Sequence, residues 1–159
     1  MVKKAGEAGY TEPDPRIDLS GVDVMRKILI LVRESGVKME LADIENVSFL
    51  PVSSQKAITV DDFMNTLISD ADHFNELRKN ASAKGCKLKF VAEFNRGKAK
   101  VGLKEIPTGH PFYNLDGKDN IVLFHTNRYI DQPLIIKGAG AGAEVTASGI
   151  FADIIRTIN

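Results

Sequence analysis

The chain has 159 residues, of which 43% are hydrophobic, and this is enough apolar sequence to bury one sizeable core. Lysine plus arginine and aspartate plus glutamate both number 21, so no global charge attracts nucleic acid or an anionic membrane surface. The one cysteine, Cys86, excludes an internal disulfide, and the sequence contains neither a secretory leader pattern nor an apolar run of about 18 residues. We therefore expect a cytoplasmic protein without nucleic-acid or membrane partners.

The first segment combines prolines with acidic residues. Residues 1–9 resemble the end of a helix whose earlier turns would precede them. Pro13 and Pro15 fix their own φ and push the preceding residues toward extended geometry. We therefore expect a stiff loop over residues 10–19 that holds acidic side chains in place.

A helix is predicted over residues 21–35. Its apolar residues form a broad stripe at helical spacing, and Gly36 is a suitable stop. Ser20 is the expected N-cap, with Asp23 three residues later in a position that suits a helix N-terminus. The acidic end of this helix therefore follows the proline loop directly.

The rest of the chain alternates between strand and helix patterns. Period-two alternation, turn residues and helical spacing predict the following elements: a short interrupted strand in 37–47, one or two helices between Thr59 and Gly85, a hairpin of 86–94 and 99–106 around Asn95-Arg96-Gly97, strands at 121–124 and 133–137, and a helix over 145–158.

Asp23 and Lys27 are four residues apart, so both side chains lie on one face of the predicted helix, near the proline loop. The plain interpretation is a surface ion pair. If Glu12 and Asp18 converge there, three carboxylates exceed one lysine, and the surplus charge suits the ammonium group of an amino-acid ligand. Lys27 would then be placed to exchange a proton with a substrate hydroxyl or carbonyl group.

The run from Gly138 to Gly142 allows two interpretations. It is either a tight turn or a loop whose backbone approaches a cofactor closely, since its glycines impose no side chain and a helix follows. It does not match the G-x-G-x-x-G dinucleotide fingerprint, because the third glycine spacing fails.

The histidines and the cysteine show no motif of their own. His73, His110 and His125 lack metal-ligand spacing, so we predict no metal site. Cys86 has no paired histidine motif and is interpreted as a structural thiol rather than a nucleophile.

Two motifs resemble those of the homoserine dehydrogenase family. The first is GYTEPDPR at 9–16, continued by DLSG at 18–21, DV at 23–24 and RK at 26–27. The second is GAGAG at 138–142, followed by VTA at 145–147 and GIFAD at 149–153. In addition, GHPFYNL at 109–115 resembles the form of the family that is fused to aspartate kinase.

The resemblance implies roles for the residues of the first motif. Lys27 is the expected general acid/base lysine, which protonates the nascent alkoxide, and Asp18 is a further acid of the catalytic pocket. Glu12 and Asp23 are expected to hold the amino-acid substrate through its ammonium group.

In the second motif, the resemblance implies that Gly142, with Gly140 as its companion, approaches the nicotinamide end of the cofactor. The chain departs from the family at Ile17, where members often carry a second acid beside the position of Asp18.

The resemblance covers essentially all 159 residues but only the C-terminal half of the family's module. It implies one α+β domain over residues 1–159, with a mixed, mostly antiparallel sheet covered by helices, that binds the substrate and dimerises. The nucleotide-binding half, with the phosphate-binding glycine motif, a second pocket lysine and a metal-binding loop, is expected upstream of Met1. This polypeptide alone is therefore expected to be inactive and to hold no cofactor tightly.

The reaction implied by the resemblance is the interconversion of L-aspartate 4-semialdehyde and L-homoserine with NAD(P)H, on the pathway to threonine and methionine. Two alternatives stay open. The chain could be a stand-alone amino-acid-binding module that kept the pocket and lost catalysis, or purely a dimerisation domain.

Overall fold

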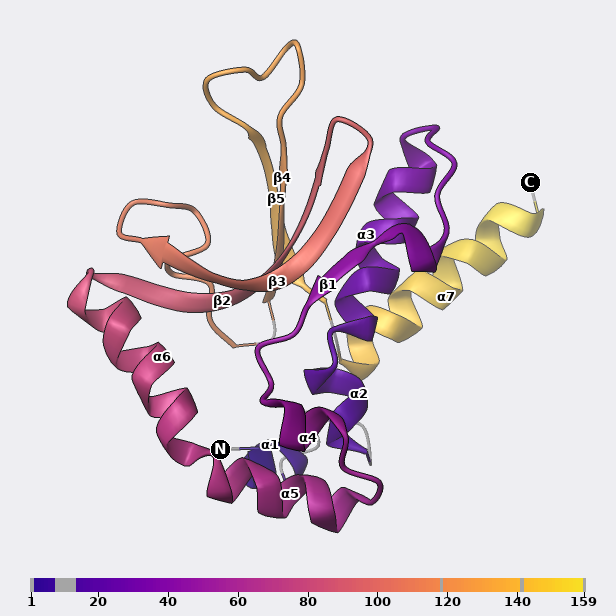
Figure 1. Cartoon of the computed structure of the whole chain (residues 1–159). Coiled ribbons are helices and arrows are strands. Elements are labelled where there is room, and N and C mark those ends of the chain that lie inside the picture. Colours follow the sequence, from indigo (N-terminus) through magenta and orange to yellow (C-terminus); the bar gives the residue numbers. More distant parts are fainter. Residues whose placement is uncertain (1, 8–13, 118, 141, 159) are drawn as a thin grey trace. The chain divides into compact units, whose positions relative to one another are not determined.

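A computed structural model describes residues 2–7, 14–117, 119–140 and 142–158, without the side chains of residues 5–7 (Figure 1). The chain forms two compact units, Met1–Thr108 and Gly109–Asn159, and each is described by itself. The single domain expected over residues 1–159 therefore stays a prediction.

The first unit contains most of the secondary structure. Its elements in chain order are α1 (Val2–Glu7), α2 (Pro15–Leu19), α3 (Val22–Glu34), the 3-10 turn η1 (Leu41–Asp43), β1 (Glu45–Val47), α4 (Val52–Gln55), α5 (Val60–Ser69), α6 (Ala71–Ala83), β2 (Cys86–Asn95) and β3 (Lys98–Pro107).

A three-stranded sheet in the order β1-β3-β2 organises this unit. The predicted hairpin is confirmed: β2 and β3 pair antiparallel from Asn95 opposite Lys98 onward. Arg96 and Gly97 between them have φ of 48° and 78°, as the two-residue turns that match strand twist require. Because β1 joins β3 in parallel, the sheet is mixed, as expected.

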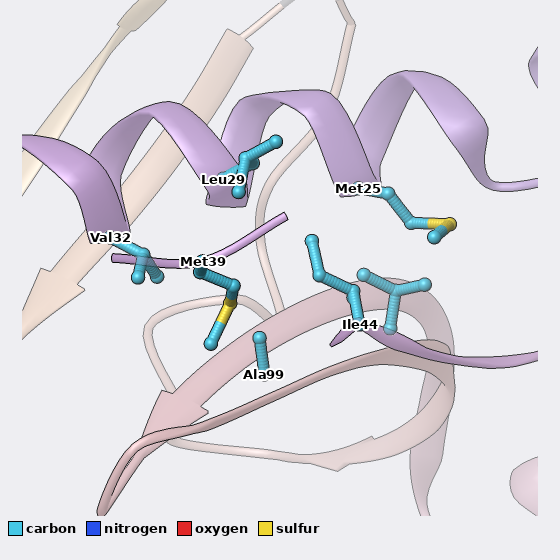
Figure 2. Packing of buried hydrophobic residues seen from close by; sticks show 7 residues of the cluster. Met25, Leu29, Val32, Met39, Ile44 and Ala99 are labelled. Atoms are coloured by element: carbon cyan, nitrogen blue, oxygen red, sulfur yellow. The ribbon is translucent and has the colours of Figure 1, made fainter. Parts of the chain in front are cut away.

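The core of the first unit lies between α3 and this sheet. Met25, Leu29 and Val32 recur at helical spacing on α3 and are buried, which confirms the apolar stripe predicted there. They pack with Met39, Ile44, Ala99 and Val101, most of which are labelled in Figure 2. Burying an aliphatic side chain of this size contributes about 1.5–3 kcal/mol, so this contact fixes α3 on the sheet.

The strand expected within residues 37–47 is much shorter than predicted. Only Glu45–Val47 forms a strand. The backbone N–H of Glu40 donates to Asp43 Oδ2 at 2.8 Å, and the N–H of Asp43 donates to the Glu40 carbonyl oxygen at 3.0 Å, so the two residues close the turn η1. Local hydrogen bonds of two acidic residues therefore replace strand pairing over the first part of the range.

The region between Thr59 and Gly85 forms two long helices, one of the outcomes expected. Thr59 caps α5 by accepting the N–H of Asp62 at 3.0 Å. Asp70 separates α5 from α6, and its Oδ2 accepts the Ser53 hydroxyl at 2.5 Å.

The second unit consists of a two-stranded antiparallel sheet, β4 (Asp119–Phe124) with β5 (Leu134–Ala139), and of the helix α7 (Ala143–Ile158). Both strands and the helix agree with the elements predicted from the sequence. The apolar side chains of α7 are exposed, with Phe151 at 65% and Ile154 at 51%. With both units, the fold is α+β with a mixed, mostly antiparallel sheet arrangement, as expected.

Candidate functional site

Within the described part of the first motif, residues 15–19 form a short helix instead of the stiff loop expected over residues 10–19. Asp14 caps α2 by accepting the N–H of Arg16 at 3.0 Å, and Pro15 occupies the first helical position. Proline suits that position because its missing N–H would have no partner there. The loop prediction is therefore wrong for residues 15–19, and residues 10–13 lie outside the described residues.

The start of α3 is also built differently from the prediction. Gly21, not Ser20, is the N-cap, with a left-handed φ of 84°. A Cβ on Gly21 would lie 2.8 Å from Phe90 Cζ, so the absence of a side chain lets the helix start approach β2 closely. Asn46 Nδ2 of β1 donates to the carbonyl oxygen of Ser20 at 2.7 Å, which fixes the turn to the sheet edge.

Asp23 and Lys27 lie on one face of α3, as predicted, and Lys27 Nζ is 2.9 Å from Asp23 Oδ2. The lysine and aspartate side chains are 54% and 51% exposed. Solvent screens an ion pair this open, so its net contribution to stability is a few tenths of a kcal/mol. The pair is therefore available to a ligand rather than needed by the fold.

Of the other two predicted acids, Asp18 is among the described residues and Glu12 is not. Asp18 is exposed on α2, in the turn that precedes Gly21, and it engages in a non-covalent interaction of its own. Glu12 lies outside the described residues. Of the four polar side chains predicted from the first motif, Asp23 and Lys27 contact each other.

A second charged pair lies at the other end of α2. Arg16 Nε donates to both carboxylate oxygens of Asp14 at 2.8 and 3.0 Å, and Nη2 donates to Oδ2 at 2.5 Å. These hydrogen bonds lower the pKa of the Asp14 carboxyl and raise the pKa of the Arg16 guanidinium. Both groups are therefore charged at neutral pH.

In the second unit, the glycine run starts at the end of a strand, and Ala141 within it lies outside the described residues. Gly138 and Ala139 end β5, opposite Asn120 and Asp119. A Cβ at Gly140 would lie 1.5 Å from Asn120 Nδ2, so packing against Asn120 is one structural reason for a glycine at this position.

Gly142 immediately precedes α7 and has a φ of 127°, which side chains other than hydrogen rarely tolerate. Its carbonyl oxygen accepts the N–H of Thr146 at 3.1 Å, so it opens the first turn of the helix. Glu144 brings a negative charge to that turn. A carboxylate in this turn opposes the binding of a phosphate group there.

Several other features bear on the predicted chemistry. Within the residues described, no three His, Cys, Asp or Glu side chains are grouped as metal ligands, and no helix is long and apolar enough to cross a membrane. Cys86 is partly buried and free. Two open surface depressions, at residues 33 and 36–40 and at residues 128–132, contain none of the predicted site residues.

Sequence reasoning gave no role to three residues that shape these segments: Arg16, Asn46 and Asn120. Arg16 lies inside the first motif, and this position was the one indication in the sequence that the residue could have a role. Asn46 and Asn120 act on Ser20 and Gly140, which are distant in sequence, and no local pattern points to either contact.

Comparison with known proteins places this fold and these motifs in a group of dehydrogenases. A family model described as homoserine dehydrogenase matches residues 1–155. A chloroplastic bifunctional aspartokinase/homoserine dehydrogenase 1 of Zea mays is 49% identical over 158 residues, which are 98% of this chain and 17% of that protein. The chain belongs to the homoserine dehydrogenase family.

Solved structures share this fold. A Candida auris protein described as of unknown function superposes with a TM-score of 0.87 and 40% identity, over 98% of this chain and 44% of that one. A putative homoserine dehydrogenase of Archaeoglobus fulgidus gives a TM-score of 0.71 and 29% identity, over 98% and 41%. This chain therefore spans less than half the length of each of these proteins.

Proposed function

We propose that this chain is the substrate-binding half of an enzyme that interconverts L-homoserine and L-aspartate 4-semialdehyde with NAD(P)H, in the biosynthesis of threonine and methionine. The family match over residues 1–155 supports this, and the observation that carries it is the exposed ion pair of Asp23 and Lys27 on α3. A lysine paired one turn from an aspartate has both the proton and the counter-charge that the reaction needs.

Lys27 is the proposed general acid and base. In the direction of reduction, the carbonyl carbon of the semialdehyde gains a hydride, and its oxygen takes a proton from the Lys27 ammonium group to become the hydroxyl of homoserine. In the reverse direction, neutral Lys27 accepts that proton. The Asp23 carboxylate, 2.9 Å from Lys27 Nζ, orients the amine on the face of α3.

The acidic residues of the first motif are proposed to hold the substrate. Glu12 and Asp23 would accept hydrogen bonds from the ammonium group that both homoserine and the semialdehyde carry, because charge-assisted hydrogen bonds are among the stronger polar contacts. Asp18, exposed on α2, is proposed as a further acid of the catalytic pocket.

NAD(P) supplies or removes the hydride when it is bound. Gly142, with its φ of 127°, and Gly140 are the residues proposed to lie against its nicotinamide end. Gly140 already accommodates Asn120, so of the two glycines Gly142 has the stronger support. We expect no tight binding of the cofactor to this chain alone.

The remaining expectations about the protein are part of the same proposal. The nucleotide-binding half would precede these residues in a parent polypeptide, whose subunits would form a dimer, and this chain alone would be inactive. The cytoplasmic location expected from the sequence stays a prediction, and the Zea mays relative is described as chloroplastic.

The test is to assay a parent polypeptide with an upstream nucleotide-binding half for reduction of NAD(P) that depends on homoserine. Lys27→Ala is expected to lower kcat by at least about 100-fold, within the range that general acid–base catalysis contributes. Lys84→Ala is the matched control, because Lys84 also forms an exposed ion pair, with Glu105 at 2.8 Å. Undiminished activity of the Lys27 variant would reject its role.

Calorimetric titration of this chain with homoserine separates the proposal from a stand-alone amino-acid-binding module. Tight binding without any cofactor would favour the binding module. No heat of binding is expected if the chain is half of an enzyme that needs its cofactor half first.

A further inference from the structure

Arg16 makes several polar contacts that the proposed function does not use. Its guanidinium makes three hydrogen bonds to the Asp14 carboxylate, at 2.8, 3.0 and 2.5 Å. The two side chains are only 33% and 30% exposed. Arg16 and Asp14 are two residues apart in sequence, and this bidentate contact between guanidinium and carboxylate holds the N-terminal end of α2 in one geometry.

The same guanidinium also reaches a distant part of the chain. Arg16 Nη1 donates to the carbonyl oxygen of Ile58 at 2.7 Å and to that of Ala57 at 3.3 Å. These carbonyls stand just before Thr59, the N-cap of α5. Arg16 therefore fastens α2 to the segment that leads into α5, across more than forty residues of sequence.

The other end of α2 has a separate attachment. The N–H of Ser20 donates to the Arg16 carbonyl oxygen at 2.8 Å, and the Ser20 carbonyl oxygen accepts Asn46 Nδ2 at 2.7 Å. One end of the helix is thus tied to residues 57–58 and the other to β1. Asp18 lies between the two attachments.

We propose that Arg16 is a positioning residue for the substrate, which holds α2 so that Asp18 keeps a fixed place relative to Asp23 and Lys27. This inference rests on the proposed function. Arg16 itself has no contact with substrate in the proposal, because its donors are committed to Asp14, Ala57 and Ile58. Its effect passes through α2 to the acids that follow.

The arrangement requires arginine because the planar guanidinium group donates to the Asp14 carboxylate on one side and to two backbone carbonyl oxygens on another. A lysine ammonium has the charge but lacks the fork that spans a carboxylate and two carbonyls. Arg16→Lys is therefore expected to fail to restore the position of α2, which distinguishes geometry from charge.

Arg33 is a matched control at the far end of α3. It makes the same kinds of contact, with Nε donating to the Met39 carbonyl oxygen at 2.9 Å and Nη2 to Glu40 Oε2 at 2.7 Å. Arg33→Gln removes one carbonyl contact and one carboxylate contact without touching α2, fewer than Arg16→Gln removes. A general loss of stability would therefore appear in both variants. A displacement of α2 would appear only in Arg16→Gln.

The first measurement uses the parent polypeptide and separates the two substrates. Arg16→Gln is expected to raise the KM for homoserine about tenfold or more, because small displacements of binding groups are costly, and to leave the KM for NAD(P) unchanged. Arg33→Gln is expected to change neither. An unchanged homoserine KM in Arg16→Gln, or equal changes in both KM values, would overturn the proposal.

The second measurement needs no activity and uses this chain alone. Hydrogen exchange at the Ile17 and Ser20 amides is expected to be several-fold faster in Arg16→Gln than in wild type and unchanged in Arg33→Gln. Equal exchange in wild type and Arg16→Gln would show that Arg16 does not hold α2. A wild-type parent that fails to oxidise homoserine would instead overturn the proposed function and the substrate role of Arg16, whatever the exchange result.

Discussion

Lys27 Nζ lies 2.9 Å from Asp23 Oδ2, and more than half of each side chain is exposed to solvent. The contact joins neighbours one turn apart on a helix that is fixed to the sheet by other residues. A substitution of Lys27 is therefore expected to leave the fold intact, which makes it a test of the role proposed for this residue.

Lys27→Ala is expected to change the free energy of unfolding by less than about 0.5 kcal/mol, because an exposed i,i+4 pair contributes only a few tenths. Urea denaturation of the wild type and the variant measures this. A loss above about 1.5 kcal/mol would mean that the pair supports the fold, and a loss of activity could then not be assigned to proton transfer.

Gly21→Ala tests the close approach of the helix start to the sheet. Gly36→Ala is the control, because Gly36 has a similar φ of 87° with no atom within 4 Å of the new Cβ. The left-handed conformation costs each variant about 1–2 kcal/mol. Gly21→Ala is expected to lose about 1–3 kcal/mol more, because its Cβ would meet Phe90 Cζ at 2.8 Å. Equal losses in thermal unfolding would contradict this contact.

Leu29→Ala tests the core beneath α3. Leu29 is 9% exposed, and its truncation is expected to cost about 2–5 kcal/mol in urea denaturation. The adjacent residue Ile30 is 60% exposed. The free energy of unfolding of Ile30→Ala is therefore expected to stay within about 0.5 kcal/mol of wild type, not counting the difference in helix propensity between the two residues. Similar losses in both variants would mean that α3 packs by a different face.

Asp14 makes stability depend on pH in the acid range. Arg16 holds the pKa of this carboxyl below its ordinary value of 3.8 in the folded chain. The stabilisation is therefore complete above the ordinary pKa and is lost as the pH falls through the lower, folded value. The difference in Tm between wild type and Asp14→Asn is expected to be constant from about pH 7 to pH 5 and to narrow below about pH 4.

Asparagine keeps the N-cap of α2, so this difference isolates the charge of Asp14. In the Asp14→Asn background, Arg16→Gln is expected to add no further dependence on acid pH. A Tm difference that stays constant down to pH 2 would contradict the assignment.

Exposed apolar side chains on α7, including Phe151 at 65% and Ile154 at 51%, predict self-association of this chain. Light scattering at high concentration measures it. Phe151→Glu with Ile154→Glu is expected to lower the apparent mass, and Ser148→Glu with Thr157→Glu controls for the added charge on the same helix. A monomeric wild type would reject the prediction.

The sequence predicted elements well where one period dominated. The spacing of Met25, Leu29 and Val32 gave α3 because burial of one helix face overrides other local preferences. The hairpin followed from alternation around Arg96-Gly97, whose positive φ values the turn needs.

The misses have local causes. Pro15 was expected to stiffen a loop, whereas at the first helical position proline is favoured, and Asp14 completes the cap. Polar contacts between Glu40 and Asp43 form a turn within the range where a strand was expected. Contacts such as Asn46 with Ser20 join residues 26 apart, and no local pattern encodes them.

The parallel pairing of β1 with β3 bears on the order of folding. Glu45 and Lys100 pair across 55 residues, and β1 has only three residues, so it cannot nucleate a sheet and must wait for the hairpin. Pulse-labelled exchange should therefore record protection in β3 before β1. Since Asn46 of β1 holds Ser20, the acidic end of α3 would reach its final place among the last events of folding, and it would be among the first parts released on unfolding.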